Sequence, residues 1–115
     1  MIRPGVRVWL ATGPVDMRRS FDALAEHVRV ILAHDPLSGH LFVFRNRLGQ
    51  RLKILWWDKA RGDGDGFAIY YKRLERGTFR FPASGEKALA IDSGQLMKLL
   101  SGLPLDIADN SARHG

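Results

Sequence analysis

The sequence predicts a single α+β domain, with a mostly antiparallel meander of about five strands, one helix after the first strand and one C-terminal helix. Short β-rich segments alternate with Gly- and Pro-containing turns, and two other segments carry the apolar spacing of amphipathic helices. A length of 115 residues suits one core. We place the domain at residues 1–107 and a flexible polar tail at 108–115.

The N-terminal part predicts a strand followed by a helix. Residues 6–12, VRVWLAT, are rich in β-branched and aromatic side chains and stop at Gly13-Pro14, so we expect a strand. Apolar side chains then recur at three- and four-residue spacings over residues 20–33. Ser20 is the expected N-cap of this helix, and Asp35-Pro36 marks its exit.

The middle of the chain predicts a series of antiparallel strands. Residues 40–45 and 51–58 flank the turn NRLG and form a hairpin, and residues 67–72 return after the glycine-rich loop KARGDGDG. A short strand is expected at 78–81, after a turn at Gly77. Connections this short do not allow parallel crossovers, so we expect neighbouring strands to be antiparallel.

The C-terminal part predicts one more short strand, at 88–91, and the second helix. Asp92 and Gln95 have the spacing of a capping box, and leucines then form a broad apolar face. Gly102 followed by Pro104 ends the helix.

Composition and motifs exclude several classes of protein. The absence of cysteine excludes disulfides and thiolate metal sites, and no apolar stretch approaches the roughly 20 residues of a membrane helix. The N-terminus lacks a secretory signal, so we expect a cytoplasmic protein without membrane association. Neither the aspartates nor the histidines form a catalytic motif. We therefore predict no enzyme, metal or cofactor, and a metal-dependent nuclease is the least favoured alternative.

Basic residues gather in the stretch from Arg45 to Arg80, which holds ten basic and four acidic residues. This excess equals the net charge of +6 of the whole chain and favours a polyanionic partner. The predicted phosphate contacts are Arg45, Arg47, Arg51, Lys53, Lys72, Arg73, Arg76 and Arg80. In the structural alternative, these charges only keep a sheet edge soluble and prevent edge-to-edge pairing.

Adjacent aromatic pairs suggest a second kind of contact. Strand alternation turns one ring of each pair inward and the other outward, which leaves Trp57 and Tyr71 as candidates for base stacking or partner contact. In the strand 51–58, the alternation places Trp57 on the same face as Arg51 and Lys53. Core packing is the competing interpretation.

Three segments, in order, resemble one family of bacterial mobile elements: GVRVWLATGPVDMRRSFDAL, DPLSGHLFVFRNRLGQRLKILWWD and GFAIYYKRLERGTFRFP. They resemble the TnpB (second reading frame) accessory protein of the insertion-sequence-66 family, which is distinct from the RNA-guided nuclease also called TnpB. The resemblance spans about residues 5–105. It implies a small protein encoded beside a separate DDE-type transposase, which carries out strand cleavage and joining. The family blocks point to Asp16, Met17, Arg18 and Arg19, to Arg45 and Lys53, and to residues 72–77.

Two hypotheses follow from the charge and the resemblance together. In the first, the chain is a non-catalytic accessory protein for transposition that contacts DNA at the element ends through a basic sheet surface and the partner transposase through an apolar or aromatic patch. In the second, it is a protein–protein adaptor whose basic surface meets an acidic surface of the transposase and never touches DNA. The oligomeric state is not predicted.

Overall fold

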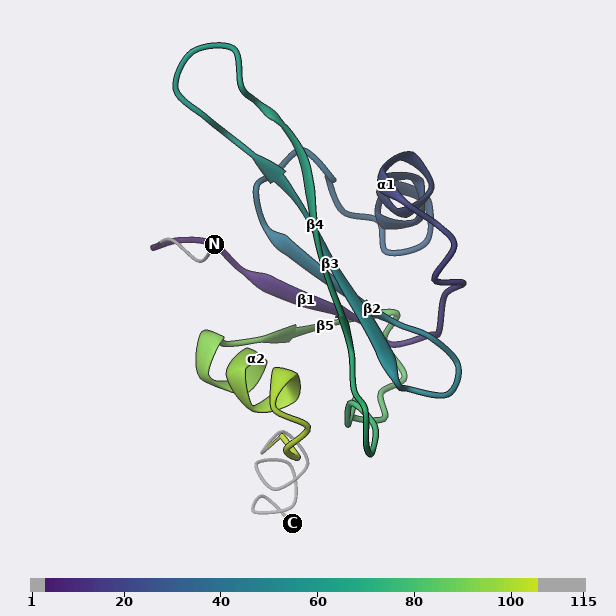
Figure 1. Ribbon diagram of the computed structural model, residues 1–115. Coiled ribbons are helices and arrows are strands. Elements are labelled where there is room, and N and C mark those ends of the chain that lie inside the picture. Colours follow the sequence, from purple (N-terminus) through teal and green to yellow (C-terminus); the bar gives the residue numbers. More distant parts are fainter. Residues whose placement is uncertain (1–3, 106–115) are drawn as a thin grey trace.

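The computed structural model describes residues 4–105, in which a five-stranded mixed sheet separates two helices (Figure 1). The elements in chain order are β1 Val8–Ala11, α1 Phe21–Val30, β2 Leu41–Arg45, β3 Arg51–Asp58, β4 Gly66–Arg73, β5 Ala88–Ile91 and α2 Ser93–Leu100. The strand order is β4-β3-β2-β1-β5. The predicted α+β class is confirmed, while the tail expected at 108–115 lies outside the described residues.

One strand pair is parallel, which the expected meander did not include. β2, β3 and β4 pair antiparallel across short connections, and β5 pairs antiparallel with β1. β1 and β2, however, pair in parallel, with Val8 opposite Leu41. The connection between these two strands contains α1 and is therefore long enough for a crossover. Short connections require antiparallel pairing only among β2, β3 and β4.

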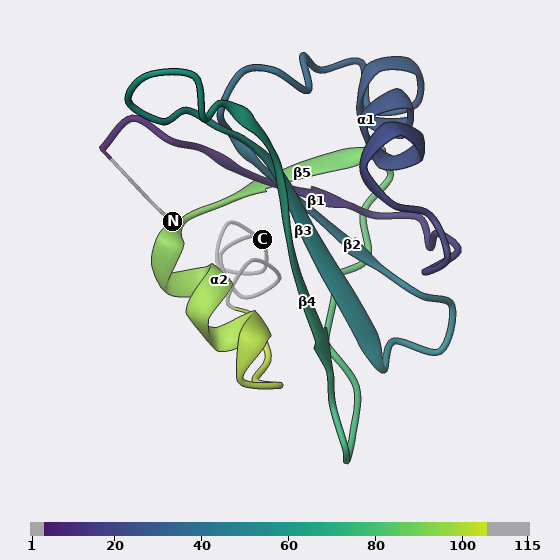
Figure 2. The same cartoon turned by 45° about the horizontal axis from the view of Figure 1, so that its top comes forward.

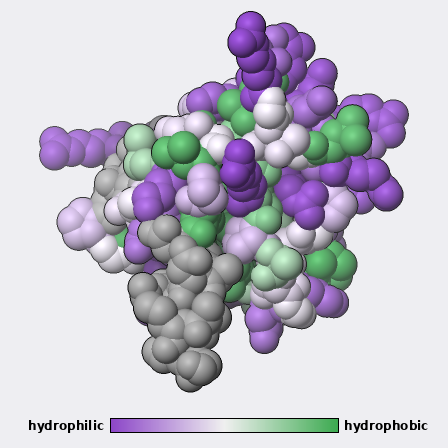
Figure 3. Space-filling view, turned by 90° about the horizontal axis from the view of Figure 1, so that it is seen from below, coloured by the Kyte–Doolittle hydropathy of each residue, from purple (hydrophilic) through white to green (hydrophobic). Residues whose placement is uncertain are grey.

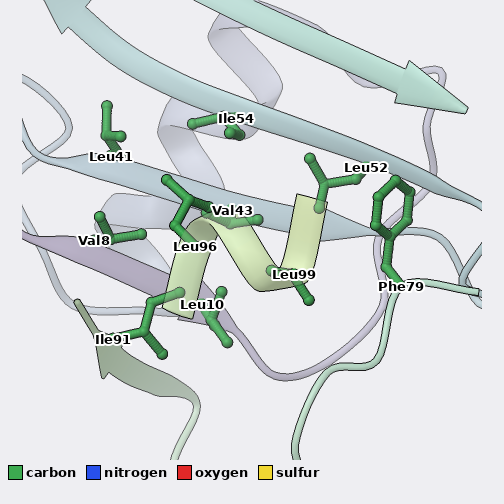
Figure 4. Close-up of a cluster of buried hydrophobic side chains, with 10 residues drawn as sticks. All are labelled: Val8, Leu10, Leu41, Val43, Leu52, Ile54, Phe79, Ile91, Leu96 and Leu99. Carbon is green, nitrogen blue, oxygen red and sulfur yellow. The ribbon is translucent and has the colours of Figure 1, made fainter. Parts of the chain in front are cut away.

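The sheet has a hydrophobic core on each face, because a helix covers each side (Figure 2). On one face, Leu96 and Leu99 of α2 pack against side chains from four strands and against Phe79 (Figure 4). On the other face, Leu24 and Val28 of α1 pack in one cluster with residues of β2 and β3. The central strand β2 is buried on both faces, since its residues 41–44 have no exposed surface.

The segment 78–81 is not a strand, so that prediction was wrong. It belongs to the connection between β4 and β5, where the Phe79 amide donates to the Gly49 carbonyl at 2.7 Å. Phe79 itself is buried in the core on the α2 face, which explains the bulky residues of this segment. Gly49 has a φ of 74°, and a Cβ built there would lie 3.3 Å from Thr78 Cβ. A glycine therefore allows the two chain segments to come this close.

The two helices begin differently. At α2, the amide of Gln95 donates to the Asp92 carboxylate at 2.7 Å and the Asp92 amide donates to the Gln95 side chain at 2.9 Å, which confirms the predicted capping box. At α1, Ser20 occupies the N-cap position but its side chain makes no capping bond. α1 also ends at Val30, earlier than predicted, and the chain turns at Ala33, whose φ is 56°.

Candidate nucleic-acid interface

Three connections meet at one end of the sheet: the β1–α1 segment, the β2–β3 turn and the start of the β4–β5 connection (Figures 1 and 2). An open cleft of about 610 Å³ lies between the first two and is lined by Asp16, Arg18, Arg47 and Arg51, among others. A second cleft places Arg47 beside Arg80. We call this region the basic end and define it by its exposed arginines: Arg18, Arg47, Arg51, Arg73, Arg76 and Arg80.

Asp16 organises the turn that leads into α1. Its carboxylate accepts hydrogen bonds from the Arg18 amide at 2.8 Å and from Arg18 Nη2 at 2.6 Å. The side-chain hydrogen bond from Arg18 is the largest cause that lowers the pKa of Asp16 to about 2. The turn is also anchored beneath, because Val15 is buried and its amide donates to the Arg45 carbonyl at 2.9 Å.

Lys53 holds this turn against the sheet. Its Nζ atom donates to the main-chain carbonyls of Met17 and Arg19, each at 2.7 Å, and lies 4.9 Å from the centre of the Tyr71 ring. Only 7% of the residue is exposed. A buried ammonium needs such partners, and these contacts satisfy it. The structure therefore places Lys53 inside the fold, where it connects β3 to the Asp16 turn, and not on a phosphate-binding surface.

Two more of the predicted phosphate contacts are also held by main-chain carbonyls. Lys72 Nζ donates to the Leu100 carbonyl at 2.8 Å, at the C-terminal end of α2, where a cation is favourable. Arg45 Nη2 donates to the Thr12 carbonyl at 3.0 Å, and its guanidinium lies 5.5 Å from the centre of the Phe81 ring. Both residues are only partly exposed. Their charges stabilise contacts between elements.

The remaining arginines are far less constrained. Within residues 4–105, Arg47, Arg76 and Arg80 make no side-chain hydrogen bond or ion pair. Arg73 contacts Glu75 at 3.1 Å in an exposed pair, and Arg51 donates to the Tyr71 hydroxyl at 3.1 Å. Arg51 and Arg73 face each other directly across β3 and β4. Like charges in this position repel, and an anion between them would relieve the repulsion.

The three connections at the basic end belong to the three segments that carry the family resemblance, and a comparison with known proteins confirms that resemblance. A family model described as "IS66 Orf2 like protein" matches residues 6–110. The chain belongs to the IS66 Orf2-like family. Proteins of this family are accessory proteins of IS66 transposition and are not known as enzymes.

Two similar proteins come from Sinorhizobium fredii. The chain is 48% identical to the uncharacterized protein y4hO over 98 residues, which cover 85% of this chain and 81% of that protein. It is 38% identical to the uncharacterized protein y4jC over 105 residues, which cover 90% of this chain and 86% of that protein. No solved structure matches the chain significantly.

The two aromatic candidates of this IS66 Orf2-like protein lie at different places. Tyr71 is 47% exposed, stands beside Arg51 and faces the Lys53 ammonium, so it belongs to the basic end. Trp57 lies toward the opposite end of β3 and packs edge-to-face on Phe67, with ring centres 5.0 Å apart. The structure thus separates Trp57 from Arg51, although strand alternation places both on one face.

Sequence reasoning missed two features of the basic end. The resemblance points to Arg18 only as part of the family motif, yet Arg18 lines the same cleft as Arg47 and Arg51. Leu48, at the tip of the β2–β3 turn, is 68% exposed and lines both clefts. An apolar residue inside the turn NRLG is a signal that the sequence does contain, because turn tips are usually polar.

The surface near this end is mainly hydrophilic. Seen from below, it carries projecting hydrophilic side chains around its margin and smaller groups of hydrophobic side chains between them (Figure 3). Across residues 4–105, no three His, Cys, Asp or Glu side chains come close enough to hold a metal ion. No helix in the same range is long and apolar enough to cross a membrane.

Proposed function

We propose that this protein assists transposition as a non-catalytic DNA-binding protein that contacts phosphates through the basic end. The observation that supports this most is the group of exposed arginines, which lie in three connections and at the adjoining ends of β3 and β4. Several of them have no side-chain partner within the described residues. Arginine suits phosphate because its planar guanidinium donates two parallel hydrogen bonds. The contacts position DNA and do not read its sequence.

A DNA titration at several salt concentrations tests this proposal. Binding to duplex DNA should weaken as salt rises, because each neutralised phosphate releases counterions. The double variant Arg47→Gln/Arg80→Gln should lower the affinity at low salt and reduce the slope of log K against log salt by about 2, at roughly 0.9 per phosphate. Both side chains are exposed, so the fold should be unaffected.

The matched control is the double variant Lys59→Gln/Arg61→Gln. It removes the same charge from exposed residues in the β3–β4 loop, at the other end of the hairpin (Figure 1). Retained affinity in this control, together with loss in the Arg47/Arg80 variant, supports a localised DNA contact. Equal losses of DNA affinity in both variants would show that only the net charge of the protein matters. Binding that does not depend on salt would contradict phosphate contact altogether.

Leu48 favours a second candidate function, in which the basic end meets an acidic surface of the partner transposase. An exposed apolar side chain among arginines is typical of the centre of a protein interface and contributes little to phosphate binding. Under this alternative, Leu48→Ser should abolish co-purification with the transposase in the presence of nuclease. Any binding of DNA by the protein alone should be the same with and without this substitution, because the adaptor does not use DNA contact. Loss of DNA binding with intact co-purification would instead leave only the first proposal.

A further inference from the structure

The two edges of the sheet differ in how they are protected. β5 has only four residues, and a short edge strand offers little to an incoming chain. β4 has eight residues, contains no proline and pairs with β3 without a bulge from Gly66 to Arg73. None of the strands described in residues 4–105 pairs with its outer side. The β4 edge therefore has neither the short length, the proline nor the bulge that commonly prevent edge pairing.

The main-chain groups that point outward from β4 follow from its pairing with β3. In an antiparallel pair, every second residue exchanges main-chain hydrogen bonds with the facing strand. The main-chain groups of the residues between them point to the other side of the strand. Leu74 donates to the Gln50 carbonyl at 2.8 Å and continues the register in which Arg51 faces Arg73. The residues whose main-chain N–H and C=O groups point away from β3 are consequently Phe67, Ile69, Tyr71 and Arg73.

The charges along this edge are complementary to those of a second copy placed antiparallel. Asp65 immediately precedes β4, and Arg73 ends it. An antiparallel copy brings the acidic start of one strand to the basic end of the other, whereas a parallel copy would place Arg73 against Arg73. The remaining charged residue of β4, Lys72, points its ammonium to the Leu100 carbonyl and is not at the edge.

We propose that β4 pairs antiparallel with β4 of a second copy of this chain, forming a symmetric dimer with one continuous sheet. Ile69 lies opposite Ile69 of the second copy, Phe67 opposite Tyr71, and Asp65 opposite Arg73. This register uses outward-pointing groups at every pair, and its central pairs are apolar or aromatic. The symmetry closes the assembly at two chains, because each copy uses the same strand.

The groups involved are available for this contact. Tyr71 and Arg73 are exposed, and Ile69 is partly exposed. Arg73 can exchange its exposed partner Glu75 for Asp65, since exposed ion pairs contribute little. Asp65 accepts one hydrogen bond from the Ala60 amide through Oδ1, which leaves its second oxygen available. The dimer carries a basic end on each copy, and the two point in opposite directions along the paired strands.

A charge exchange measured by sedimentation velocity tests the register on the full chain without DNA. The unmodified protein should form a reversible dimer, and Arg73→Asp or Asp65→Lys should each raise the dimer dissociation constant by about tenfold or more, because like charges then face each other. The double variant Arg73→Asp/Asp65→Lys should restore dimerisation. A protein that stays monomeric at every concentration, or a double variant as weak as the single ones, would overturn the proposal.

Cysteine crosslinking gives an independent readout, since the chain contains no cysteine of its own. In the Ile69→Cys variant, the two facing residues would have Cα atoms about 5.5 Å apart, within the range of a disulfide. The matched control is Ala90→Cys, an exposed position on the other edge strand, β5. A covalent dimer from the Ile69 variant alone supports pairing through β4, and equal crosslinking of both variants contradicts it.

Discussion

Two sets of basic residues share the stretch from Arg45 to Arg80, and their surroundings differ. Arg45, Lys53 and Lys72 donate to main-chain carbonyls of other elements and are at least partly buried. Arg47, Arg76 and Arg80 project from connections, where the described residues offer them no side-chain partner. A charged residue that joins elements stabilises the fold, whereas a charged residue in solvent is available to a ligand. The net charge of a segment therefore overstates the charge that can reach a partner.

Among the basic residues of this stretch, Lys53 should contribute most to the stability of the fold. Lys53→Met keeps the aliphatic stem but removes the donor to the Met17 and Arg19 carbonyls, so we expect a loss of about 2–3 kcal/mol in the free energy of unfolding. Urea unfolding measures this loss. The control Lys59→Met, at an exposed loop position, should change the free energy by less than about 0.5 kcal/mol. Equal effects of the two substitutions would remove the distinction between the sets.

Lys72 should have a smaller effect. It donates to the single carbonyl of Leu100, at a helix terminus that is itself partly open to water, so Lys72→Met should cost about 1 kcal/mol. The loss should appear in the same urea experiment. Hydrogen exchange should also increase in the last turn of α2, which this bond holds near β4. If Lys72→Met lowered the free energy of unfolding as much as Lys53→Met, two carbonyl partners would stabilise the fold no more than one.

Acid should weaken the Asp16 turn by a modest amount. The pKa of Asp16 in the folded protein is about 2, below its ordinary value of 3.8. As the pH falls, Asp16 is therefore protonated in the unfolded chain before it is protonated in the folded one. The resulting stabilisation is complete above about pH 4 and is lost as the pH falls through about 2. Unfolding free energies measured across this window should depend less on pH in Asp16→Asn. Arg18→Gln should have the same effect, since Arg18 causes the shift, and an unchanged pH dependence in that variant would refute this cause.

The exposed arginines should have the smallest effect on stability. Arg47→Gln/Arg80→Gln should change the free energy of unfolding by less than about 0.5 kcal/mol, because neither side chain has a hydrogen-bond or ion-pair partner among the described residues. The same sample should show the reduced DNA affinity described above. Strong destabilisation would show that these two residues join elements, as Arg45, Lys53 and Lys72 do, and are not free to bind a ligand.

Local patterns explain what could be predicted. The three- and four-residue spacing of apolar side chains identified both helices, and the capping box at Asp92 was found at its predicted place. Alternation identified the strands that form the sheet, but it mistook the bulky segment 78–81 for another strand. That segment is buried through a single residue, Phe79, and its place beside Gly49 depends on contacts between distant parts of the chain.

The sequence by itself determined the α+β class, the family and the concentration of positive charge between Arg45 and Arg80. Only the tertiary structure decided which of those charges are free, that β1 and β2 run parallel, and that β4 forms an open edge. The reason is physical. Helix and strand patterns depend on neighbours a few residues apart, whereas the carbonyl partners of Lys53 lie 34 and 36 residues away and meet it only after the sheet has formed.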